Sequence, residues 1–399
     1  MAEWIECKIS DIGTVVGGAT PSTKKLENYD NGEIAWITPK DLSTFSGRYI
    51  VRGERNITEI GLNSCSTQIM PKNTVLFSSR APIGYVAIAA NEVCTNQGFK
   101  SVVPNTNTDP LFLYYLLKYN KDKIESMGSG TTFKEVSGNT MKNIVVSVPK
   151  DKKVQEKIGS ILGSIDDKIE ENVKINNNLE QQTQELFKAW FVTFETFGGK
   201  MPSSWSVAKL GDVATIKTNS FSPAKNPTVM LEHYSIPAFD EQKYPVFELA
   251  SNVKSNKYIL TDNSVMISKL NPGTKRVWRP MCISEFVVSS TEFIIFEAND
   301  PTYKDYVFSV IDSPAFSDWM CAHTTGSTNS RQRTTPSTTL EFQIALPTQE
   351  IVSDFCKIVT PMYDMIAQNT CENRKLAVFR DSLLPKLMSG ELDVSNIEI

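Results

Sequence analysis

Two stretches of the chain share one long pattern of seam positions at alternating spacings of three and four, which are apolar or uncharged polar throughout the first stretch and, except for Arg380, throughout the second. The pattern runs from Ile158 to Trp190 and again from Phe355 to Leu387. This spacing is that of the a and d positions of a heptad repeat, so each stretch predicts a long helix with a coiled-coil seam. From Ile165 onward, each seam position of the first stretch recurs 197 residues later in the second.

Both seams carry a pair of asparagines in the same two central slots, Asn172 and Asn176 in the first and Asn369 and Asn373 in the second. An asparagine in such a seam weakens the helix pairing but fixes register and partner. The two helices are therefore predicted to pair with each other. An antiparallel arrangement would place Asn172 opposite Asn373 and Asn176 opposite Asn369. The alternative is two unrelated amphipathic helices that pack on separate domains.

The segment before each helix predicts a mixed α/β globule. In the first globule, short runs rich in β-branched and aromatic residues predict strands at residues 34–38, 74–78, 85–89, 100–103 and 144–148. Asp109 and Pro110 then predict the start of a helix, with the aspartate as its N-cap. The second globule repeats this order: residues 205–222 echo 4–22, and Asp300 with Pro301 repeats the helix start. Residues 226–253 have no clear counterpart in the first globule.

The chain is thus predicted to be a tandem duplication of the α+β class, in which two mixed α/β globules are separated by two long helices that form an antiparallel coiled coil. The predicted segments are residues 1–150 (first globule), 151–197 (central helix), 198–347 (second globule) and 348–399 (C-terminal helix). A length of 399 residues is more than one ordinary core requires.

Composition is that of a globular chain, with 40% hydrophobic and 22% charged residues. No run of 18 apolar residues predicts a membrane span, and the N-terminus lacks the pattern of a secretory signal. Seven scattered cysteines without a CxxC pair indicate free thiols in a reducing compartment, so we expect a cytoplasmic location. The formal net charge of −4 argues weakly against indiscriminate nucleic-acid binding.

Motifs for chemistry are missing. The two histidines, His233 and His323, have no cysteine or carboxylate neighbours at ligand spacing, so no metal site is predicted. No glycine-rich segment has the pattern of a phosphate-binding loop or of a dinucleotide or methyl-donor site. We therefore expect neither a cofactor nor catalysis in this chain.

Polar and basic loops remain, and they occur at matching places in both globules. Arginine, lysine, asparagine and glutamine read base edges, while serine, threonine and lysine bind phosphates. For each loop taken singly, a solvated surface is the alternative. The candidate DNA contacts are Thr20, Ser22, Lys24, Lys25, Ser79, Arg80, Thr131, Thr132 and Lys134 in the first globule, and Lys269, Lys275, Arg276, Arg279, Asn329, Arg331 and Arg333 in the second.

The whole chain resembles the specificity subunit of Type I restriction-modification enzymes. Residues 178–192 and 380–392 resemble the two conserved spacer regions of that family, and GGATPS (17–22) and SRAPIG (79–84) resemble recurring motifs of its target recognition domains. The second globule departs from this pattern. Its SFSP (220–223) is a remnant of the first motif, and NPG (271–273) stands where the second would be.

The resemblance implies that each globule is a target recognition domain for one half of a bipartite sequence in double-stranded DNA. It implies that the paired helices set the gap and dock two modification subunits, which bring S-adenosylmethionine, and that motor-nuclease subunits join for cleavage. Two other hypotheses stay open at this point: a stand-alone DNA-binding regulator with two reading heads, and a coiled-coil scaffold that binds no DNA.

Overall fold

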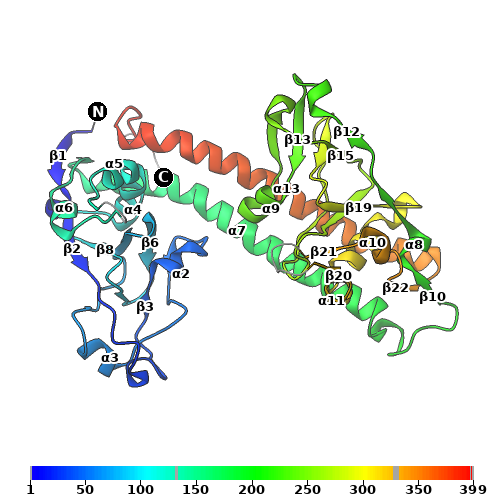
Figure 1. Cartoon of the computed structure of the whole chain (residues 1–399). Coiled ribbons are helices and arrows are strands. Elements are labelled where there is room, and N and C mark those ends of the chain that lie inside the picture. The colour runs from blue at the N-terminus through cyan, green and yellow to red at the C-terminus, as the bar shows by residue number, and fades with distance from the viewer. Residues whose placement is uncertain (1, 131–133, 327–331, 396, 398–399) are drawn as a thin grey trace. The chain divides into compact units, whose positions relative to one another are not determined.

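The computed structural model describes residues 2–130, 134–326, 332–395 and 397. The chain divides into two units, unit 1 with Met1–Glu170 and Arg374–Ile399, and unit 2 with Glu171–Asn373. Each unit holds one β-rich globule and part of each of two 40-residue helices, α7 (Lys152–Phe191) and α13 (Gln349–Met388) (Figure 1). The two helices lie inside the helical segments expected from the sequence, and the predicted α+β class is confirmed.

Unit 1 is built on one five-stranded sheet with the strand order β2-β8-β5-β6-β4. Its neighbours are antiparallel except β4 and β6, which run parallel. A separate ribbon pairs β1 with β9, and a short parallel pair joins β3 to β7. The strands are β1 (Trp4–Lys8), β2 (Gly13–Gly17), β3 (Trp36–Ile37), β4 (Tyr49–Ile50), β5 (Val75–Ser79), β6 (Ile83–Ala89), β7 (Cys94–Thr95), β8 (Lys100–Pro104) and β9 (Val145–Pro149).

The main helix of this globule is α4 (Pro110–Tyr119), which begins where the sequence predicts it. Asp109 accepts a hydrogen bond from the backbone N–H of Phe112 at 2.7 Å, and Pro110 occupies the first helical turn. The helix is buried over six consecutive residues and packs against β5 and β6. The other helices are α1 (Ile9–Ile12), η1 (Leu26–Asn28), α2 (Pro39–Ser43), α3 (Glu59–Asn63), α5 (Lys121–Ser126) and α6 (Gly138–Asn143).

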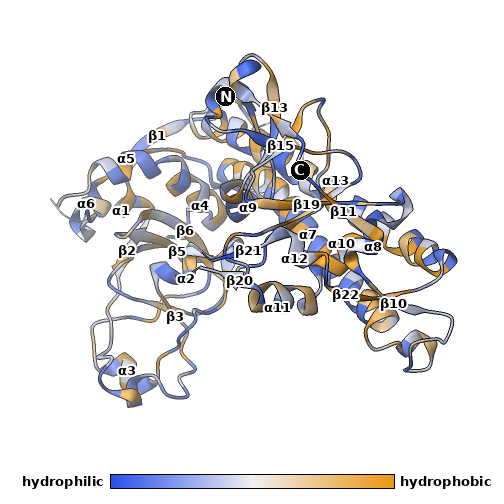
Figure 2. Ribbon diagram, turned by 45° about the vertical axis from the view of Figure 1, so that its right-hand side comes forward, coloured by the Kyte–Doolittle hydropathy of each residue, from blue (hydrophilic) through white to orange (hydrophobic). Residues whose placement is uncertain are grey.

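Unit 2 contains a four-stranded sheet in the order β11-β19-β16-β17, a ribbon of β10 with β22, and a five-stranded sheet in the order β12-β15-β18-β13-β14. In the four-stranded sheet, the inner strand β19 is hydrophobic over most of its length (Figure 2). The strands are β10 (Ser206–Lys209), β11 (Ala214–Lys217), β12 (Ser220–Phe221), β13 (Met230–Tyr234), β14 (Val246–Leu249), β15 (Lys257–Ile259), β16 (Ser264–Ser268), β17 (Val277–Trp278), β18 (Val287–Ser289), β19 (Phe293–Ala298), β20 (Thr324–Thr325), β21 (Arg333–Thr334) and β22 (Gln343–Leu346).

The helices of unit 2 follow the same succession as those of unit 1. Asp300 caps the turn η5 (Pro301–Tyr303), which leads into α10, as the repeated Asp-Pro pair predicts. The remaining helices are η2 (Glu195–Phe197), α8 (Leu210–Val213), η3 (Pro223–Lys225), α9 (Ile236–Gln242), η4 (Ala250–Asn252), α10 (Lys304–Asp312), α11 (Pro314–Ala322) and α12 (Pro336–Thr339).

The predicted duplication is visible in the strand order. Four strands of unit 1, β2-β8-β5-β6, correspond in sequence order and pairing to β11-β19-β16-β17, and the ribbon β1-β9 corresponds to β10-β22. The expectation that residues 226–253 lack a counterpart is wrong in part. Strand β13 is followed by α9 and pairs in parallel with β18, as β3 in unit 1 is followed by α2 and pairs in parallel with β7. Among the described strands, β14 and the wider sheet around it have no counterpart in unit 1.

The two long helices pack against each other inside each unit. In unit 1, Ile158 and Leu162 of α7 share a core with Leu387 and Met388 of α13. In unit 2, Phe187 and Phe191 of α7 share a core with Phe355 of α13. The beginning of one helix therefore lies beside the end of the other, which is the antiparallel pairing that the sequence predicts.

The central asparagines hydrogen-bond across the helix pair. Asn172 donates from Nδ2 to Oδ1 of Asn373 at 2.9 Å, and Asn369 donates from Nδ2 to Oδ1 of Asn176 at 2.9 Å. These are the two pairs that the antiparallel heptad register predicts. Asn172 is fully buried, so its amide would lose a hydrogen bond if the helices moved out of register.

Beyond Thr183 the most buried face of α7 shifts by one residue. Trp190 contacts Phe355 of α13, with 5.7 Å between ring centroids, as the seam predicts, but Leu186 and Trp190 are only partly buried, whereas Phe187 and Phe191 are buried. The reason is that this end of α7 packs into the globule of unit 2 as well as on α13, so burial follows a spacing of four.

Candidate nucleic-acid interface

The first candidate loop of unit 1, residues 17–22, is fixed to the turn before β8. The backbone N–H of Ala19 donates to the carbonyl of Thr95 at 3.1 Å, and the Thr20 hydroxyl donates to Gln97. Gly18 has no room for a side chain, because an added Cβ would lie 2.1 Å from the Thr95 carbonyl oxygen. The loop therefore presents exposed side chains from a rigid backbone. These are Thr20, Ser22, Lys24 and Lys25.

The second candidate loop begins at the end of β5, and there the structure changes one expectation. Ser79 is fully buried and its hydroxyl donates to the carbonyl of Gly98 at 3.1 Å, so it holds the turn and offers no exposed group to a ligand. Arg80, which follows it, has 36% of its side chain exposed. Ser79 therefore fixes the backbone of the turn, and Arg80 presents a partly exposed side chain.

Glu135 joins the side chains around this turn, and the sequence analysis did not single it out. Its carboxylate lies 3.6 Å from Nη1 of Arg80 and 3.3 Å from Nζ of Lys100. Lys100 also approaches the Ser79 hydroxyl at 3.4 Å and the carbonyl of Gln97 at 3.5 Å. Lys100 could have been recognised from the sequence, because it directly follows a polar turn at residues 95–99 that also supplies Gln97. The contact with Glu135 had no local signal.

Several predicted contacts have no structural description. Thr131 and Thr132 of unit 1, and Asn329 and Arg331 of unit 2, lie outside the described residues. Lys134 is described and exposed. All five remain predictions from the sequence.

The basic cluster expected in unit 2 consists largely of ion pairs. Nζ of Lys275 lies 2.6 Å from Asp312. Arg276 donates two hydrogen bonds to Asp240, at 2.6 and 2.9 Å. Each of these two candidate DNA contacts is thus paired with a carboxylate at least 36 residues away in the sequence, and their contact with DNA stays a prediction.

The Arg279 side chain is largely buried. It donates to both carboxylate oxygens of Asp305, at 2.7 and 3.2 Å, and lies 2.9 Å from Asp364 of α13. Burial lowers the pKa of Arg279, but its hydrogen bonds with Asp305 outweigh burial and leave the pKa raised. Arg279 therefore fastens the globule of unit 2 to α13 and is a structural residue.

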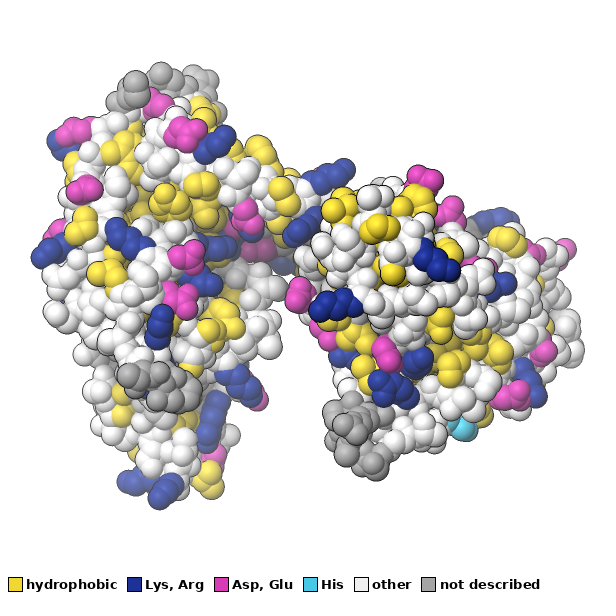
Figure 3. Space-filling view, turned by 45° about the horizontal axis from the view of Figure 1, so that its top comes forward, with side chains coloured by type: hydrophobic (Ala, Val, Ile, Leu, Met, Phe, Trp, Pro, Cys, Tyr) yellow, Lys and Arg dark blue, Asp and Glu magenta, His cyan; other side chains and the backbone are white. Residues whose placement is uncertain are grey.

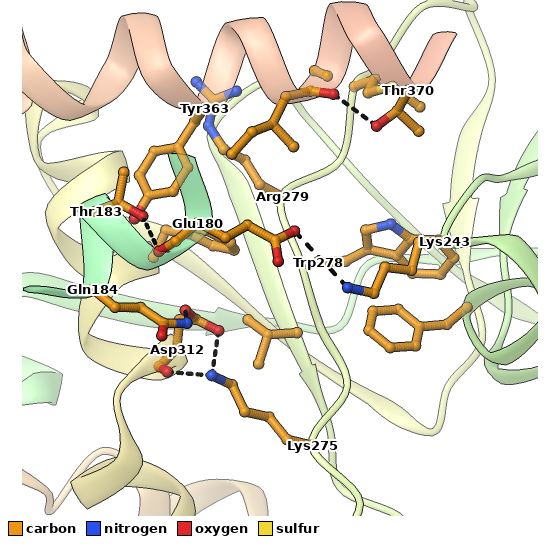
Figure 4. A pocket seen from close by; sticks show the side chains of 16 residues that line it. Glu180, Thr183, Gln184, Lys243, Lys275, Trp278, Arg279, Asp312, Tyr363 and Thr370 are labelled. Carbon is orange, nitrogen blue, oxygen red and sulfur yellow. Dashed lines mark hydrogen bonds and ion pairs between the residues drawn. The ribbon is translucent and has the colours of Figure 1, made fainter. Parts of the chain in front are cut away.

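Lys275 and Arg279 line a cavity of about 310 Å³ between the long helices and the globule of unit 2 (Figure 4). Glu180 from α7 and Lys243 after α9 face each other across it at 3.8 Å. Dashed lines in Figure 4 join Glu180 to Lys243 and Lys275 to Asp312, so these four side chains point toward one another in pairs. The ion pairs that line this cavity therefore link different elements of unit 2 to one another.

Two predicted cations of unit 2 remain near the surface. Arg333 has 44% of its side chain exposed and makes a two-point contact with Glu292, at 2.9 and 3.2 Å. Lys269 is half-buried, and its backbone joins the turn before β19 through a hydrogen bond to the carbonyl of Glu292. On the face drawn in Figure 3, basic and acidic side chains are interspersed, in keeping with paired cations.

Within the described part of the chain, no group of three or more His, Cys, Asp and Glu side chains could hold a metal ion. The described helices include none that is long and apolar enough to cross a membrane. The site is therefore characterised by loops carrying cations, amides and hydroxyls on a rigid frame.

Comparison with known proteins decides the family. Residues 1–181 match the model described as the Type I restriction modification DNA specificity domain. The chain is 34% identical over 437 residues to the Type I restriction enzyme MjaIX specificity subunit of Methanocaldococcus jannaschii, with 99% of this chain and 95% of that one covered. The chain belongs to the Type I restriction-modification specificity subunits. It is accordingly the DNA target-specificity subunit of such a system and is not its catalytic subunit.

Further matches agree with this membership. The specificity subunit is 24% identical over 374 residues to the HindI specificity subunit of Haemophilus influenzae, covering 74% of this chain and 80% of that one. The crystal structure of a Type I system S subunit from M. genitalium has the same fold, with a TM-score of 0.66, 16% identity and coverage of 97% and 96%. Membership in this family removes the stand-alone regulator and the scaffold as explanations.

Proposed function

We propose that each unit of this specificity subunit reads one half of a bipartite target in double-stranded DNA, and that α7 and α13 set the gap between the two halves. The residues 1–150 and 198–347 would act as the two target recognition domains. Residues 151–197 and 348–399 would act as the two conserved spacers.

The observation that carries this proposal is one frame bearing two different sets of side chains. The shared strand order β2-β8-β5-β6 and β11-β19-β16-β17 places a loop at the same point of each unit, after β5 and after β16. In unit 1, Arg80 lies in this loop and Lys100 begins the neighbouring strand β8. In unit 2, Lys269 lies in this loop and Arg333 of β21 forms a backbone bridge with Leu270 beside it. Because base edges are distinguished by side-chain identity, two such loops would read two unlike sequences.

The helices support a role for two equal partners. The Asn172–Asn373 and Asn176–Asn369 pairs exchange with each other when α7 and α13 exchange roles, so the helix pair has pseudo-twofold symmetry. Such a surface suits two copies of one partner. We propose that these partners are two modification subunits that carry S-adenosylmethionine, and that motor-nuclease subunits join them for cleavage in the cytoplasm.

A domain exchange tests the proposal. Residues 1–150 are replaced by the equivalent part of a relative, and the methylated sites of cells carrying this chain and its modification subunit are mapped. The cut falls directly after β9, so the helix pairing stays intact. One half of the methylated sequence should change and the other half and the gap should stay. The reciprocal exchange of residues 198–347 is the control and should change the other half. A simultaneous change of both halves in either chimera contradicts two independent readers.

A further inference from the structure

The backbone places one charged residue at equivalent points of the two units. In unit 1, the N–H of Ser79 donates to the carbonyl of Gly98 at 2.7 Å, and the N–H of Val136 donates to the carbonyl of Ser79 at 3.0 Å. In unit 2, the N–H of Lys269 donates to Glu292 at 2.9 Å, and the N–H of Thr334 donates to Lys269 at 3.1 Å. Val136 therefore corresponds to Thr334, and the residues before them correspond too.

Those preceding residues carry opposite charges, Glu135 in unit 1 and Arg333 in unit 2. Both take part in a local antiparallel pair, Glu135 with Ser129 and Arg333 with Thr325. Both have partly exposed side chains, 39% for Glu135 and 44% for Arg333. The backbone thus fixes the position of the charged residue, and its charged group is partly exposed at the surface.

Each of these side chains forms ion pairs next to a turn, the turn that precedes β8 in unit 1 and the turn that precedes β19 in unit 2. Glu135 holds Arg80 and Lys100, and Arg333 is held by Glu292. Partly exposed ion pairs of this kind contribute little to stability, about 0–1 kcal/mol. Stability of the fold alone therefore gives little reason for a carboxylate beside the candidate reading cations in both units.

A carboxylate beside a reading cation changes how that cation meets DNA. An unpaired arginine or lysine binds any phosphate, and this contact carries no sequence information. A carboxylate lowers the local positive charge and limits the orientations of the guanidinium. Base-edge acceptors that match the held orientation can still be bound, whereas random phosphates gain less.

We propose that Glu135 and Glu292 are positioning residues that restrain the reading cations, Arg80 and Lys100 in unit 1 and Arg333 in unit 2. They weaken binding to non-target DNA and thereby raise the discrimination of their own half of the target. This inference rests on the proposed function, because it assigns the two carboxylates to the two readers.

The test uses the complex of the full chain with its modification subunits. Glu135→Gln removes one charge of unit 1 with little change of shape, and Glu292→Gln does the same in unit 2. The matched controls are Glu3→Gln and Glu341→Gln, which make the same change of charge in the exposed pairs with Lys150 and Lys209. Glu135→Asp keeps the charge and tests rescue.

Non-target DNA binding is measured between 50 and 200 mM salt. One freed cation that gains one phosphate contact steepens the slope of log K against log salt by about 0.9, a change of about three- to fourfold over this range. We expect this for Glu135→Gln and Glu292→Gln, and no such change for the two controls or for Glu135→Asp. Equal slopes for Glu135→Gln and Glu3→Gln would overturn the proposal.

Methylation of targets that carry one mismatch distinguishes a failure of this inference from a failure of the proposed function. Glu135→Gln should relax the half read by unit 1 and leave the other half strict, and Glu292→Gln should do the reverse. If neither variant relaxes any half while the domain exchange still alters one half, the positioning role is wrong and the two-reader function stands. If either variant relaxes both halves equally, the assignment of one half to each unit is wrong.

Discussion

Unit 1 and unit 2 share a frame and differ in where the frame places charge. The backbone hydrogen bonds around Ser79 are repeated around Lys269, yet an acidic residue in one unit, Glu135, occupies the place of a basic one in the other, Arg333. The sheet and its hairpin therefore fix the position of the candidate reading groups. The residue types at those positions differ between the units, as the proposed reading of two unlike half-sequences requires.

The helix pair shows the same contrast in its packing. The positions of Asp166 and Arg380 in unit 1 correspond, by the offset of 197 residues, to Tyr363 and Thr183 in unit 2. In unit 1 they form a largely buried ion pair with 2.6 Å between Nη1 and Oδ1, and Tyr115 donates to the same carboxylate. In unit 2 the same two positions carry no charge: the Tyr363 hydroxyl hydrogen-bonds to the Ser309 hydroxyl at 3.0 Å, and the Thr183 hydroxyl donates to the carbonyl of Glu180 at 2.9 Å.

The largest effect is expected from breaking the ion pair. Arg380→Ala leaves the buried Asp166 carboxylate without its cation, which should lower the free energy of unfolding by about 3–5 kcal/mol. The matched change in unit 2, Thr183→Ala, removes the neutral hydrogen bond from the Thr183 hydroxyl to the carbonyl of Glu180 and should cost about 1 kcal/mol. Urea unfolding with hydrogen exchange resolved by unit measures both. Equal losses in the two variants would contradict the contrast between the units.

A smaller effect is expected at the central asparagines. Asn172→Leu leaves Asn373 without its donor and should cost about 1–3 kcal/mol. The double variant Asn172→Leu/Asn373→Leu replaces both partners by apolar side chains and should recover most of that loss, although the register becomes less specific. A double-mutant cycle of thermal unfolding measures the coupling. Additive losses would show that the two side chains do not act as a pair.

The sequence predicted those features of the fold that depend on local spacing or on neighbouring residues. The heptad spacing predicted the antiparallel helix pair and its Asn172–Asn373 contact, and Asp109 with Pro110 predicted the start of α4. Both are determined by residues within a few turns of helix, together with a repeated pattern. The repeat of the globules could be recognised because the same local signals recur in the same order.

The candidate site was less predictable, because its chemistry depends on residues far apart in the chain. Arg276 appears as a free cation in the sequence, but Asp240 neutralises it from α9, and Asp305 neutralises Arg279 in the same way. Glu135 reaches Arg80 from a hairpin 55 residues later. Ser79 is polar, yet the sheet buries it. Only the fold brings these groups together.

The proposed function requires that α7 and α13 set the distance between two independent readers. Four helix-forming residues inserted after Glu170 of α7, with four more after Asn373 of α13, would lengthen the helix pair at the boundary of the two units. Each helix grows by about 6 Å and turns by about 400°, a net rotation of about 40°. One base pair of DNA turns by about 35°, and its rise is about 3.4 Å.

The rotation matches one extra base pair and should dominate, because a reader that faces the wrong side of the duplex cannot bind, whereas a few ångströms can be taken up by tilt. The decisive measurement is a map of the methylated sites in cells that carry this variant and its modification subunit. We predict a target whose two half-sequences are unchanged and whose gap is one base pair longer. Full methylation with an unchanged gap would contradict the claim that the helices set the distance.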